Sequence, residues 1–243
     1  MRILQLNIWT GRIKGALLDF LKNNKFDVIC LQEAVWSNRD DVLENFCASV
    51  RQISGVSGLS YIAESSNWEM GFLDSDSVIK QGNVVLSREE IIQNRVETVY
   101  GGKTIVNKAD DFMDHEYTLQ IVKLTNGLNV VNHHGYWLPT PMGDDTTVAV
   151  MRKVAEFVKE LNGPLVMCGD LNVIHNSPAM RELDFLRDLT EEYEITNTLS
   201  GLKFNGEVAC DHILVNDRIK VRDFRVLDEI VSDHKGLIAE IDF

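Results

Sequence analysis

Short apolar runs alternate along the chain with polar segments rich in turn-forming residues. Most runs have the length of a β-strand and are rich in aliphatic residues, which is typical of buried strands. The predicted strands are residues 3–8, 28–31, 83–86, 117–124, 129–132, 165–168, 209–215, 220–227 and 237–241.

A second spacing, of three and four residues, indicates helices. It is clearest over residues 145–161, where Val148, Met151, Ala155 and Val158 share one helical face. Acidic residues favour the amino end of this helix, and a Gly-Pro pair stops it. Shorter helices are predicted at residues 14–23, 40–53 and 179–186.

Predicted strands and helices are interleaved from one end of the chain to the other, without a linker, a low-complexity stretch or a repeat. The pair Asn126-Gly127 joins two strands as a hairpin turn. We therefore expect one domain, residues 1–243, of the α/β (α+β) class, with mixed β-sheets.

Composition is that of an ordinary globular chain, with 243 residues and 44% apolar content. No apolar run approaches the roughly 20 residues of a membrane-spanning helix, and the amino terminus has no signal region. We therefore expect no membrane association and a cytoplasmic location. Four cysteines lack C-x-x-C spacing and mostly lie in apolar runs, which favours reduced core residues over zinc ligands. They are Cys30, Cys47, Cys168 and Cys210.

The net charge of −13 disfavours tight, nonspecific binding of long duplex DNA. Lysines and arginines are scattered rather than clustered. The charge does not exclude nucleic acid, because acids gathered in one pocket bind divalent cations, and these supply the positive field that a phosphate needs. Other acids are interpreted as parts of solvated loops. They are Asp74, Asp76, Asp110, Asp111 and Asp114.

Polar residues stand at or just after the ends of several predicted strands, where open α/β sheets collect their ligands. Glu33, supported by Gln32, offers the hard oxygen ligand that Mg²⁺ prefers, whereas Zn²⁺ requires more nitrogen or sulfur. Asn7 occupies a similar position. Taken alone, each residue also fits a solvated strand end or a turn.

The segment Gly169-Asp170-Leu171-Asn172 follows an apolar strand, so its carboxylate emerges at a protected sheet edge. In an extended segment Leu171 points away and leaves Asp170 and Asn172 on one side. An acid and an amide so placed can orient water and hydrogen-bond a phosphoryl oxygen. A tight turn without a chemical role explains the segment equally well.

Two acid–histidine dipeptides, Asp211-His212 and Asp233-His234, lie near the carboxyl end of the chain. A buried carboxylate fixes the tautomer of a histidine and favours its protonated form, and Asp211 is the candidate partner for His234. Asp233 then faces the opposite way and is free to bind metal. His212 faces away from Asp211 and is interpreted as structural.

Consecutive histidines, His133 and His134, cannot both point into one pocket. We choose His134, because it shares a strand face with Asn132 and leads into an aromatic pair, Tyr136-Trp137, suited to a substrate wall. A metal-binding pair is the alternative, but two ligands on one element are not usually consecutive.

Together these residues resemble the endonuclease/exonuclease/phosphatase superfamily, over residues 3–241. Each motif is short, but their order along the chain is that of the family. The matching segments are Leu6-Asn7, Leu31-Gln32-Glu33, Gly82-Asn83-Val84-Val85-Leu86-Ser87, Asn132-His133-His134, Gly169-Asp170-Leu171-Asn172, Asp211-His212-Ile213-Leu214-Val215 and Ser232-Asp233-His234.

The resemblance implies a four-layer α/β/β/α sandwich, in which two mixed sheets pack face to face with helices outside. It also implies that Asn7, Glu33 and Asp233 surround Mg²⁺, for which Mn²⁺ substitutes. Asn7 would also touch phosphate.

The remaining roles implied by the resemblance concern the reacting phosphate. Asp170 would activate or position the attacking water, and Asn172 would hold a non-bridging oxygen. Asp211 and His234 would form an acid–histidine pair at the scissile phosphate. His134 would act as a general acid or as a phosphate ligand. The loop after His134 departs from the family pattern, so the substrate stays open.

The implied reaction is metal-assisted hydrolysis of a phosphodiester by in-line attack of water, by a monomer. Three hypotheses follow. The first is a nuclease or DNA-end-processing phosphodiesterase for DNA or RNA, single-stranded or at an end, with Tyr136, Trp137 and Trp68 stacking on a base. The second is a phosphatase or phosphodiesterase for small molecules or lipid head groups, which the acidic charge favours. The third, a non-catalytic binding module, is disfavoured because no expected ligand is missing.

Overall fold

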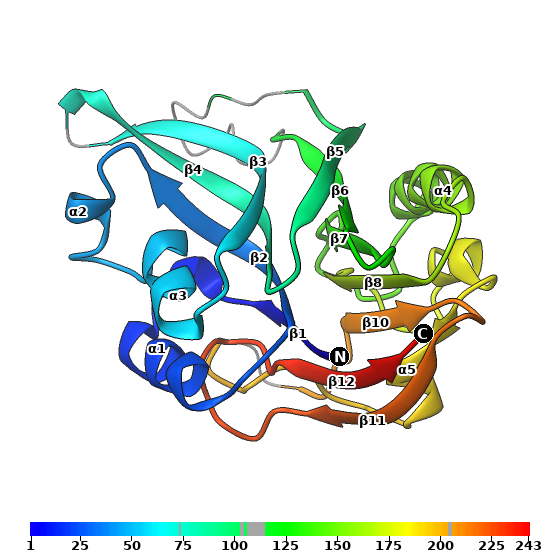
Figure 1. The fold of residues 1–243 in the computed structure, drawn as a ribbon. Coiled ribbons are helices and arrows are strands. Elements are labelled where there is room, and N and C mark those ends of the chain that lie inside the picture. The colour runs from blue at the N-terminus through cyan, green and yellow to red at the C-terminus, as the bar shows by residue number, and fades with distance from the viewer. Residues whose placement is uncertain (73, 103–104, 106–114, 204–205) are drawn as a thin grey trace.

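A computed structural model describes residues 1–72, 74–102, 105, 115–203 and 206–243 of the chain (Figure 1). Asp110, Asp111 and Asp114, interpreted above as solvated loop residues, lie outside the described residues. The same interpretation was wrong for Asp74 and Asp76, which belong to a strand. Strand pairing uses backbone groups, so an acidic segment can extend a hairpin without an apolar pattern.

The first sheet has six strands in the order β11-β12-β1-β2-β4-β3. Only β1 and β2 pair in parallel, and the other neighbours are antiparallel. Its strands are β1 (Arg2–Asn7), β2 (Val28–Ser37), β3 (Tyr61–Phe72), β4 (Asp74–Ser87), β11 (Lys220–Val226) and β12 (Leu237–Asp242).

The second sheet also has six strands, in the order β5-β6-β7-β8-β10-β9. Here β7 and β8 form the parallel pair, in the same place as β1 and β2 in the first sheet. Its strands are β5 (Ile91–Tyr100), β6 (Tyr117–Leu124), β7 (Asn129–His134), β8 (Leu165–Asp170), β9 (Arg187–Asp188) and β10 (Asp211–Val215).

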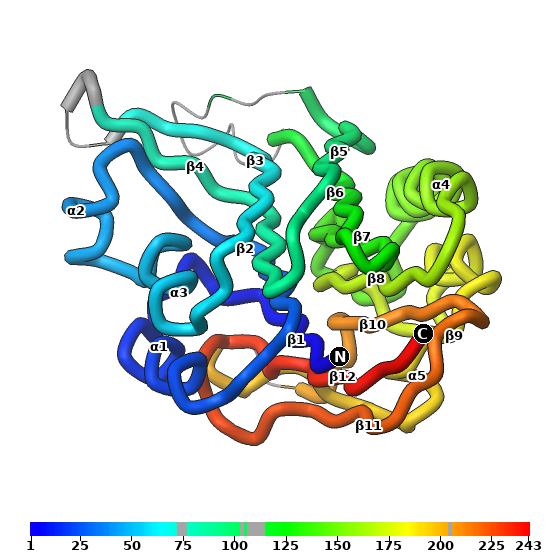
Figure 2. The backbone as a smooth tube through the Cα atoms, viewed as in Figure 1, coloured from blue at the N-terminus to red at the C-terminus, as the bar shows by residue number. Residues whose placement is uncertain are grey.

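Helices cover the outer face of each sheet, and the two inner faces pack together (Figures 1 and 2). α1 and α3 pack on the first sheet, and α4 packs on the second. The predicted four-layer sandwich is therefore confirmed. The helices are α1 (Lys14–Asn23), α2 (Asp40–Leu43), α3 (Val50–Ser57), α4 (Asp145–Lys159) and α5 (Leu189–Glu192), with 3₁₀ turns η1 (Trp9–Gly11) and η3 (Met180–Leu183).

Alternation along each central strand explains how polar residues reach the interior. In β8, Leu165 and Met167 pack outward against α4, whereas Val166 and Cys168 pack inward between the sheets. The next inward position is Asp170. Because every second side chain points to the same face, the inward-facing residues of a strand are apolar in the core and become polar at the strand's end.

Several details of the secondary structure differ from the prediction. The predicted helix 179–186 is only the 3₁₀ turn η3. The strands β3 and β5 were not predicted, because both lie at sheet edges and β5 is largely exposed, so neither has an apolar pattern. The predicted helix 40–53 is two helices, α2 and α3. Ser49 separates them, since its extended backbone and its hydroxyl, which accepts from the amide of Gln52, begin α3.

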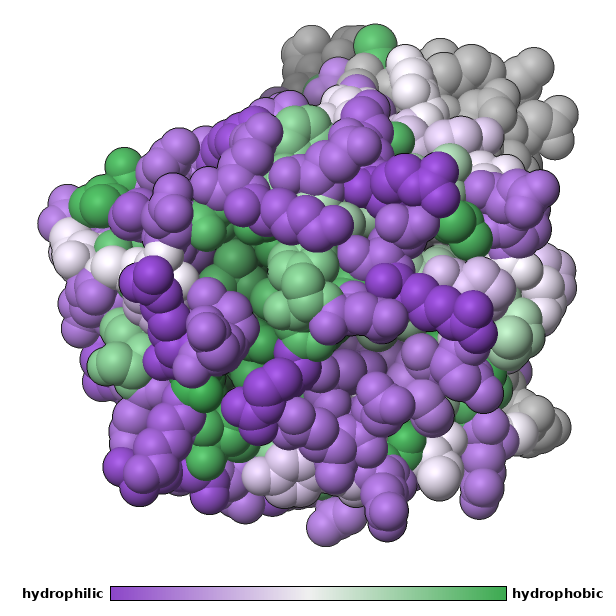
Figure 3. Space-filling model, turned by 90° about the vertical axis from the view of Figure 1, so that its right-hand side faces the viewer, coloured by the Kyte–Doolittle hydropathy of each residue, from purple (hydrophilic) through white to green (hydrophobic). Residues whose placement is uncertain are grey.

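The described surface is mainly polar. The face drawn in Figure 3 is predominantly hydrophilic, with hydrophobic residues in small patches. Within the described ranges, no helix has both the length and the apolar character needed to cross a membrane.

Candidate active site

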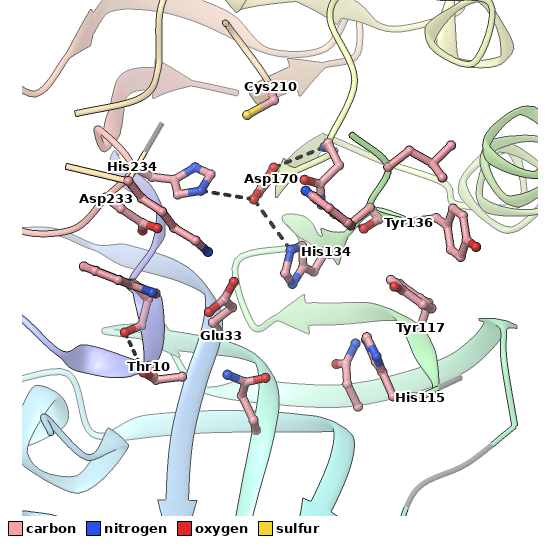
Figure 4. A pocket seen from close by; sticks show the side chains of 18 of the residues that line it. Thr10, Glu33, His115, Tyr117, His134, Tyr136, Asp170, Cys210, Asp233 and His234 are labelled. Atoms are coloured by element: carbon pink, nitrogen blue, oxygen red, sulfur yellow. Dashed lines mark hydrogen bonds and ion pairs between the residues drawn. The ribbon is translucent and has the colours of Figure 1, made fainter. Parts of the chain in front are cut away.

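The predicted site residues lie together at one end of the two sheets. The parallel pairs end there, and the antiparallel strands β10 and β12 begin there. A cavity of about 1050 Å³ opens at this end (Figure 4). Among the predicted residues, Glu33, His134, Asp170, Asn172, Asp233 and His234 line it. Asn7 and Asp211 are buried directly behind that lining.

Glu33 lies at a β-bulge rather than at the end of its strand, so that expectation was wrong. β2 continues to Ser37, and its pairing with β4 shifts between Leu31 and Ala34. The backbone of Glu33 is left-handed, with φ of 52°. A bulge re-aims a side chain without ending the strand, which explains how Glu33 reaches the cavity from mid-strand.

Asn7 joins the two carboxylates on either side of it. Its Nδ2 donates to Glu33 Oε1 at 3.2 Å and to Asp170 Oδ2 at 3.0 Å. Its Oδ1 accepts from the amide of Trp9 at 3.0 Å. Trp9, Thr10 and Gly11 all have positive φ, so a strained turn directly after Asn7 fixes that amide.

Asp170 is the carboxylate on which the site converges. Its Oδ2 lies 3.6 Å from Nε2 of His134 and 3.6 Å from Nε2 of His234. Its Oδ1 accepts from the amide of Asn172 at 3.1 Å. Only 1% of Asp170 is exposed, so the oxygen between the two imidazoles is the part that meets the cavity.

Asp211 and His234 form a buried acid–histidine pair. Asp211 Oδ2 accepts from Nδ1 of His234 at 2.8 Å. Burial opposes protonation of the ring, but the charges of Asp211 and Asp170 outweigh it and raise the pKa of His234 well above its ordinary value. Burial likewise opposes ionisation of Asp211, but His234 lowers the pKa of that carboxyl. The pair is therefore an imidazolium and a carboxylate at neutral pH.

Asp233 faces away from this pair, on the side of Glu33. Burial first, and the charge of Glu33 in addition, raise the pKa of Asp233, although His234 and Lys203 act against this. Ser232 donates a hydrogen bond to Asp233 Oδ1 at 3.1 Å. A partly buried carboxylate whose ionisation is disfavoured, with a second carboxylate near it, is the arrangement that a bound cation stabilises.

The two consecutive histidines have opposite surroundings. His134 lines the cavity, whereas His133 is fully buried and its Nδ1 hydrogen-bonds the carbonyl of Thr118 at 3.0 Å. Burial lowers the pKa of His133 to about 4, so this ring is neutral. His134 therefore reaches the cavity and His133 is part of the core.

Two glycines allow the strand ends that carry His134 and Asp170 to approach closely. A β-carbon on Gly135 would lie 2.2 Å from the carbonyl oxygen of Leu171, and one on Gly169 would lie 2.2 Å from that of His133. Asn172, with φ of 57°, donates from Nδ2 to the carbonyl of Gly135 at 2.9 Å. The amide of Gly135 also donates to the carbonyl of Asp170 at 2.8 Å, so the two segments are joined through their backbones.

Aromatic residues form one wall of the cavity. Tyr136 packs against Tyr100 and Tyr117, with ring centroids 4.9 and 5.2 Å apart, and Trp137 is 45% exposed. Trp68 also lines the cavity, but it is only 7% exposed and packs in an apolar cluster. Tyr136 and Trp137 are thus better placed than Trp68 to meet a ligand.

The sequence patterns missed a buried network behind the site. Gln5 Nε2 donates to Asp211 Oδ1 at 3.0 Å and to Gln32 Oε1 at 2.9 Å. Gln32 Nε2 in turn donates to Asn132 Oδ1 at 2.7 Å. The signal available was a glutamine inside an apolar strand, on the inner face that Asn7 shares.

The sequence patterns also missed three residues of the cavity lining, namely Arg12, Lys203 and Cys210. The guanidinium carbon of Arg12 lies 5.0 Å and the ammonium of Lys203 lies 6.0 Å from the ring centroid of Trp9. Cys210, expected in the core, is buried but also lines the cavity. Burial, with the charges of Asp170 and Asp211, raises the pKa of its thiol, which is therefore protonated at neutral pH.

Comparison with solved structures shows the same fold in several bacterial and human proteins. An endonuclease/exonuclease/phosphatase from Bacteroides vulgatus has 14% identity and a TM-score of 0.71, covering 100% of this chain and 98% of that one. The Bacteroides thetaiotaomicron mannosyl-6-phosphatase has 16% identity and a TM-score of 0.64, covering 100% of both chains. The human Nocturnin catalytic domain has 14% identity and a TM-score of 0.67, covering 100% of this chain and 93% of that one.

The sequence itself assigns the family. No curated protein matches it. The model of the endonuclease/exonuclease/phosphatase family matches residues 4–234, which spans every site residue described above. The chain therefore belongs to the endonuclease/exonuclease/phosphatase family and is a phosphoric ester hydrolase.

Proposed function

We propose that the protein is a Mg²⁺-dependent phosphodiesterase that hydrolyses its substrate by in-line attack of water. The observation that carries this proposal is the division of the cavity into two polar sides. Glu33 and Asp233, with Asn7 beside them, form an acidic side. Asp170, between His134 and His234, forms the other.

The acidic side fits a magnesium ion in its donor chemistry. Glu33 and Asp233 supply hard oxygen ligands, and Asn7 Oδ1 retains a second lone pair beside the hydrogen bond from Trp9. Bound there, Mg²⁺ would neutralise the phosphoryl oxygens and the leaving oxygen. Mn²⁺, which accepts the same oxygen ligands, should substitute.

The other side supplies proton transfer and orientation. Asp170, as a carboxylate, accepts the proton of the attacking water. His234, held as an imidazolium by Asp211, donates from Nε2 to a phosphoryl oxygen. His134 presents its Nε2 to the same place and donates to a phosphoryl oxygen or to the leaving oxygen. Asn172 at the cavity wall binds a non-bridging oxygen through its amide.

For the substrate, we propose a single-stranded or terminal nucleic-acid phosphodiester. Tyr136 and Trp137 at the cavity wall, together with Trp9, are suited to stacking on unpaired bases. The two cations beside Trp9 are placed to meet the phosphate of a neighbouring nucleotide.

A small phosphate ester is the second candidate, and the charge distribution favours it. Of the described residues that line the cavity, Arg12 and Lys203 are the only lysine or arginine. The chain carries a net charge of −13, which disfavours a long polyanion. By its name, the Bacteroides thetaiotaomicron relative in fold acts on a mannosyl 6-phosphate.

A substrate panel with Mg²⁺ tests both candidates. It compares single-stranded DNA, an abasic duplex, a 5′-tyrosyl oligonucleotide, RNA and a small bis-ester, each with wild type and with Asp170→Asn. We expect cleavage of at least one oligonucleotide by wild type and loss of that cleavage in the variant. Turnover of the bis-ester alone supports the small-molecule candidate. Near-wild-type turnover by Asp170→Asn would contradict the mechanism.

A further inference from the structure

Cys210 is a buried thiol beside the acid–histidine pair, and the proposed hydrolysis does not use it. Its Sγ lies 3.8 Å from Asp211 Oδ2, the oxygen that is also 2.8 Å from Nδ1 of His234. Figure 4 shows Cys210 beside His234 and Asp170. The sulfur therefore lies on the Asp211 side of the imidazole.

Four side chains at this place have the donor atoms of a transition-metal site. Asp170, Cys210, Asp211 and His234 each offer one ligand atom, and these atoms all lie within 4.8 Å of one another. All four residues are buried. Zinc bonds of roughly 2.0–2.3 Å place tetrahedral ligand atoms roughly 3.3–3.8 Å apart, so shifts of about 1 Å close the cluster around an ion.

This donor set differs in kind from the acidic side of the cavity. Glu33 and Asp233 offer oxygen, which suits Mg²⁺. Cys210 and His234 add sulfur and nitrogen, for which Zn²⁺ and Co²⁺ compete far better than Mg²⁺. One cavity thus holds a hard-ligand side and a mixed sulfur–nitrogen side, with Asp170 between them.

We propose that Asp170, Cys210, Asp211 and His234 form an inhibitory site for Zn²⁺, separate from the magnesium site. The ion takes the place of one ring proton of the His234 imidazolium and of the thiol proton of Cys210, and both protons leave to solvent. The occupied site removes the imidazolium and engages the carboxylate of Asp170. Only the activity readout of this proposal rests on the proposed function.

Cobalt absorption tests the site without any substrate. Co²⁺ is added to wild type, Cys210→Ser, Cys210→Ala and Cys47→Ser. Cys47 is the matched control, because it is a buried thiol packed in a different, apolar cluster. We expect a thiolate-to-cobalt charge-transfer band in wild type and Cys47→Ser, and no band in either Cys210 variant. A band of equal strength in a folded Cys210 variant, or none in wild type, overturns the proposal.

Zinc titration tests the inhibition. Hydrolysis of the most active substrate of the panel is followed at saturating Mg²⁺ with buffered free Zn²⁺. We expect inhibition of wild type and Cys47→Ser that additional Mg²⁺ does not relieve, and Cys210→Ser should need on the order of 10²-fold more Zn²⁺. Equal zinc sensitivity in all proteins overturns the inhibitory role. If wild type hydrolyses no substrate of the panel in the absence of zinc, the proposed function fails, and the cobalt experiment still decides whether the site exists.

Discussion

Two aspartate–histidine pairs lie on opposite faces of β10, one residue apart. On the inner face Asp211 pairs with His234, and on the outer face His212 pairs with Asp188, each with Nδ1 2.8 Å from a carboxylate oxygen. The partner charge outweighs burial in both and raises the pKa of both histidines. The two pairs therefore have the same Nδ1–carboxylate distance and the same direction of pKa shift.

The second ring nitrogen distinguishes the pairs. Nε2 of His212 is 2.9 Å from the carbonyl of Val173, so both nitrogens of that ring are used within the fold. Nε2 of His234 faces Asp170 across 3.6 Å at the cavity. A histidine held by an acid can act on a substrate only if its other nitrogen is open to one.

The largest expected effect comes from removing the inner histidine. His234→Ala should lower kcat by on the order of 10³-fold or more, because a hydrogen-bond donor to the phosphoryl oxygen is lost. The melting temperature should change much less. Steady-state kinetics with the most active substrate of the panel measure the change. Retention of more than a tenth of wild-type kcat would contradict the role given to His234.

Breaking the outer pair should instead lower stability. Asp188→Asn leaves the buried imidazolium of His212 without its counter-charge, which costs on the order of 3–5 kcal/mol of unfolding free energy. Denaturant unfolding measures that loss, and kcat of the folded fraction should stay within about threefold of wild type. Asp211→Asn is the matched control on the inner face, with its larger loss in kcat. Equal catalytic losses in the two variants would remove the distinction between the pairs.

His133 sharpens the comparison, because it is a buried histidine without an acid. Its pKa falls to about 4 from an ordinary value near 6.5, since burial dominates. The unfolded chain therefore binds a proton before the folded chain does, so this contribution to stability is present above pH 6.5 and is lost as the pH falls toward 4. Relative to His133→Gln, wild type should lose on the order of 3 kcal/mol over that interval.

Urea unfolding of wild type and His133→Gln at pH 7.5, 6, 5 and 4.5 gives the difference in their free energies of unfolding. Carboxylate titrations that both proteins share cancel in that difference. A difference that does not change with pH would show that the pKa of His133 is the same in the folded and the unfolded chain. In that case burial without a paired carboxylate would not be enough to keep a histidine neutral.

The smallest effect concerns the amide that supports the inner pair. Gln5→Leu removes the hydrogen bond to Asp211 Oδ1, while Oδ2 keeps His234. We expect kcat to fall by about tenfold with KM little changed, since a net hydrogen bond to a charged group is worth about 1.5–3 kcal/mol. Gln120→Leu, at the far end of the same network, is the control and should keep wild-type kcat. A matching loss in both variants would point to general loosening of the interior.

Much of the fold was predictable from local pattern. Strands with buried inner and outer faces, such as 165–168, have continuous apolar runs, and α4 has a clear helical stripe. Edge strands such as β5 were not predictable, because their pairing uses backbone groups and leaves their side chains exposed. The expected monomeric state and cytoplasmic location stay predictions.

The candidate site divides in the same way. The identities and order of Asn7, Glu33, His134, Asp170, Asp211 and His234 were visible, because polar residues after apolar runs are conspicuous. The bulge that aims Glu33, the amide of Gln5 behind Asp211 and the thiol beside His234 were not visible. Each depends on a neighbour distant in sequence, and no local period encodes it.

By itself, then, the sequence determined which residues are available and which strand face each occupies, because the period of two is a local property of the backbone. Only the tertiary structure decided whether the second ring nitrogen of a paired histidine is covered or open to a cavity. His212 in β10 uses both nitrogens on Asp188 and Val173, whereas His234, just before β12, uses Nδ1 on Asp211 and has Nε2 at the cavity. That choice is made by packing two sheets face to face, since packing decides which nitrogen is covered by a carbonyl and which is left to meet a ligand.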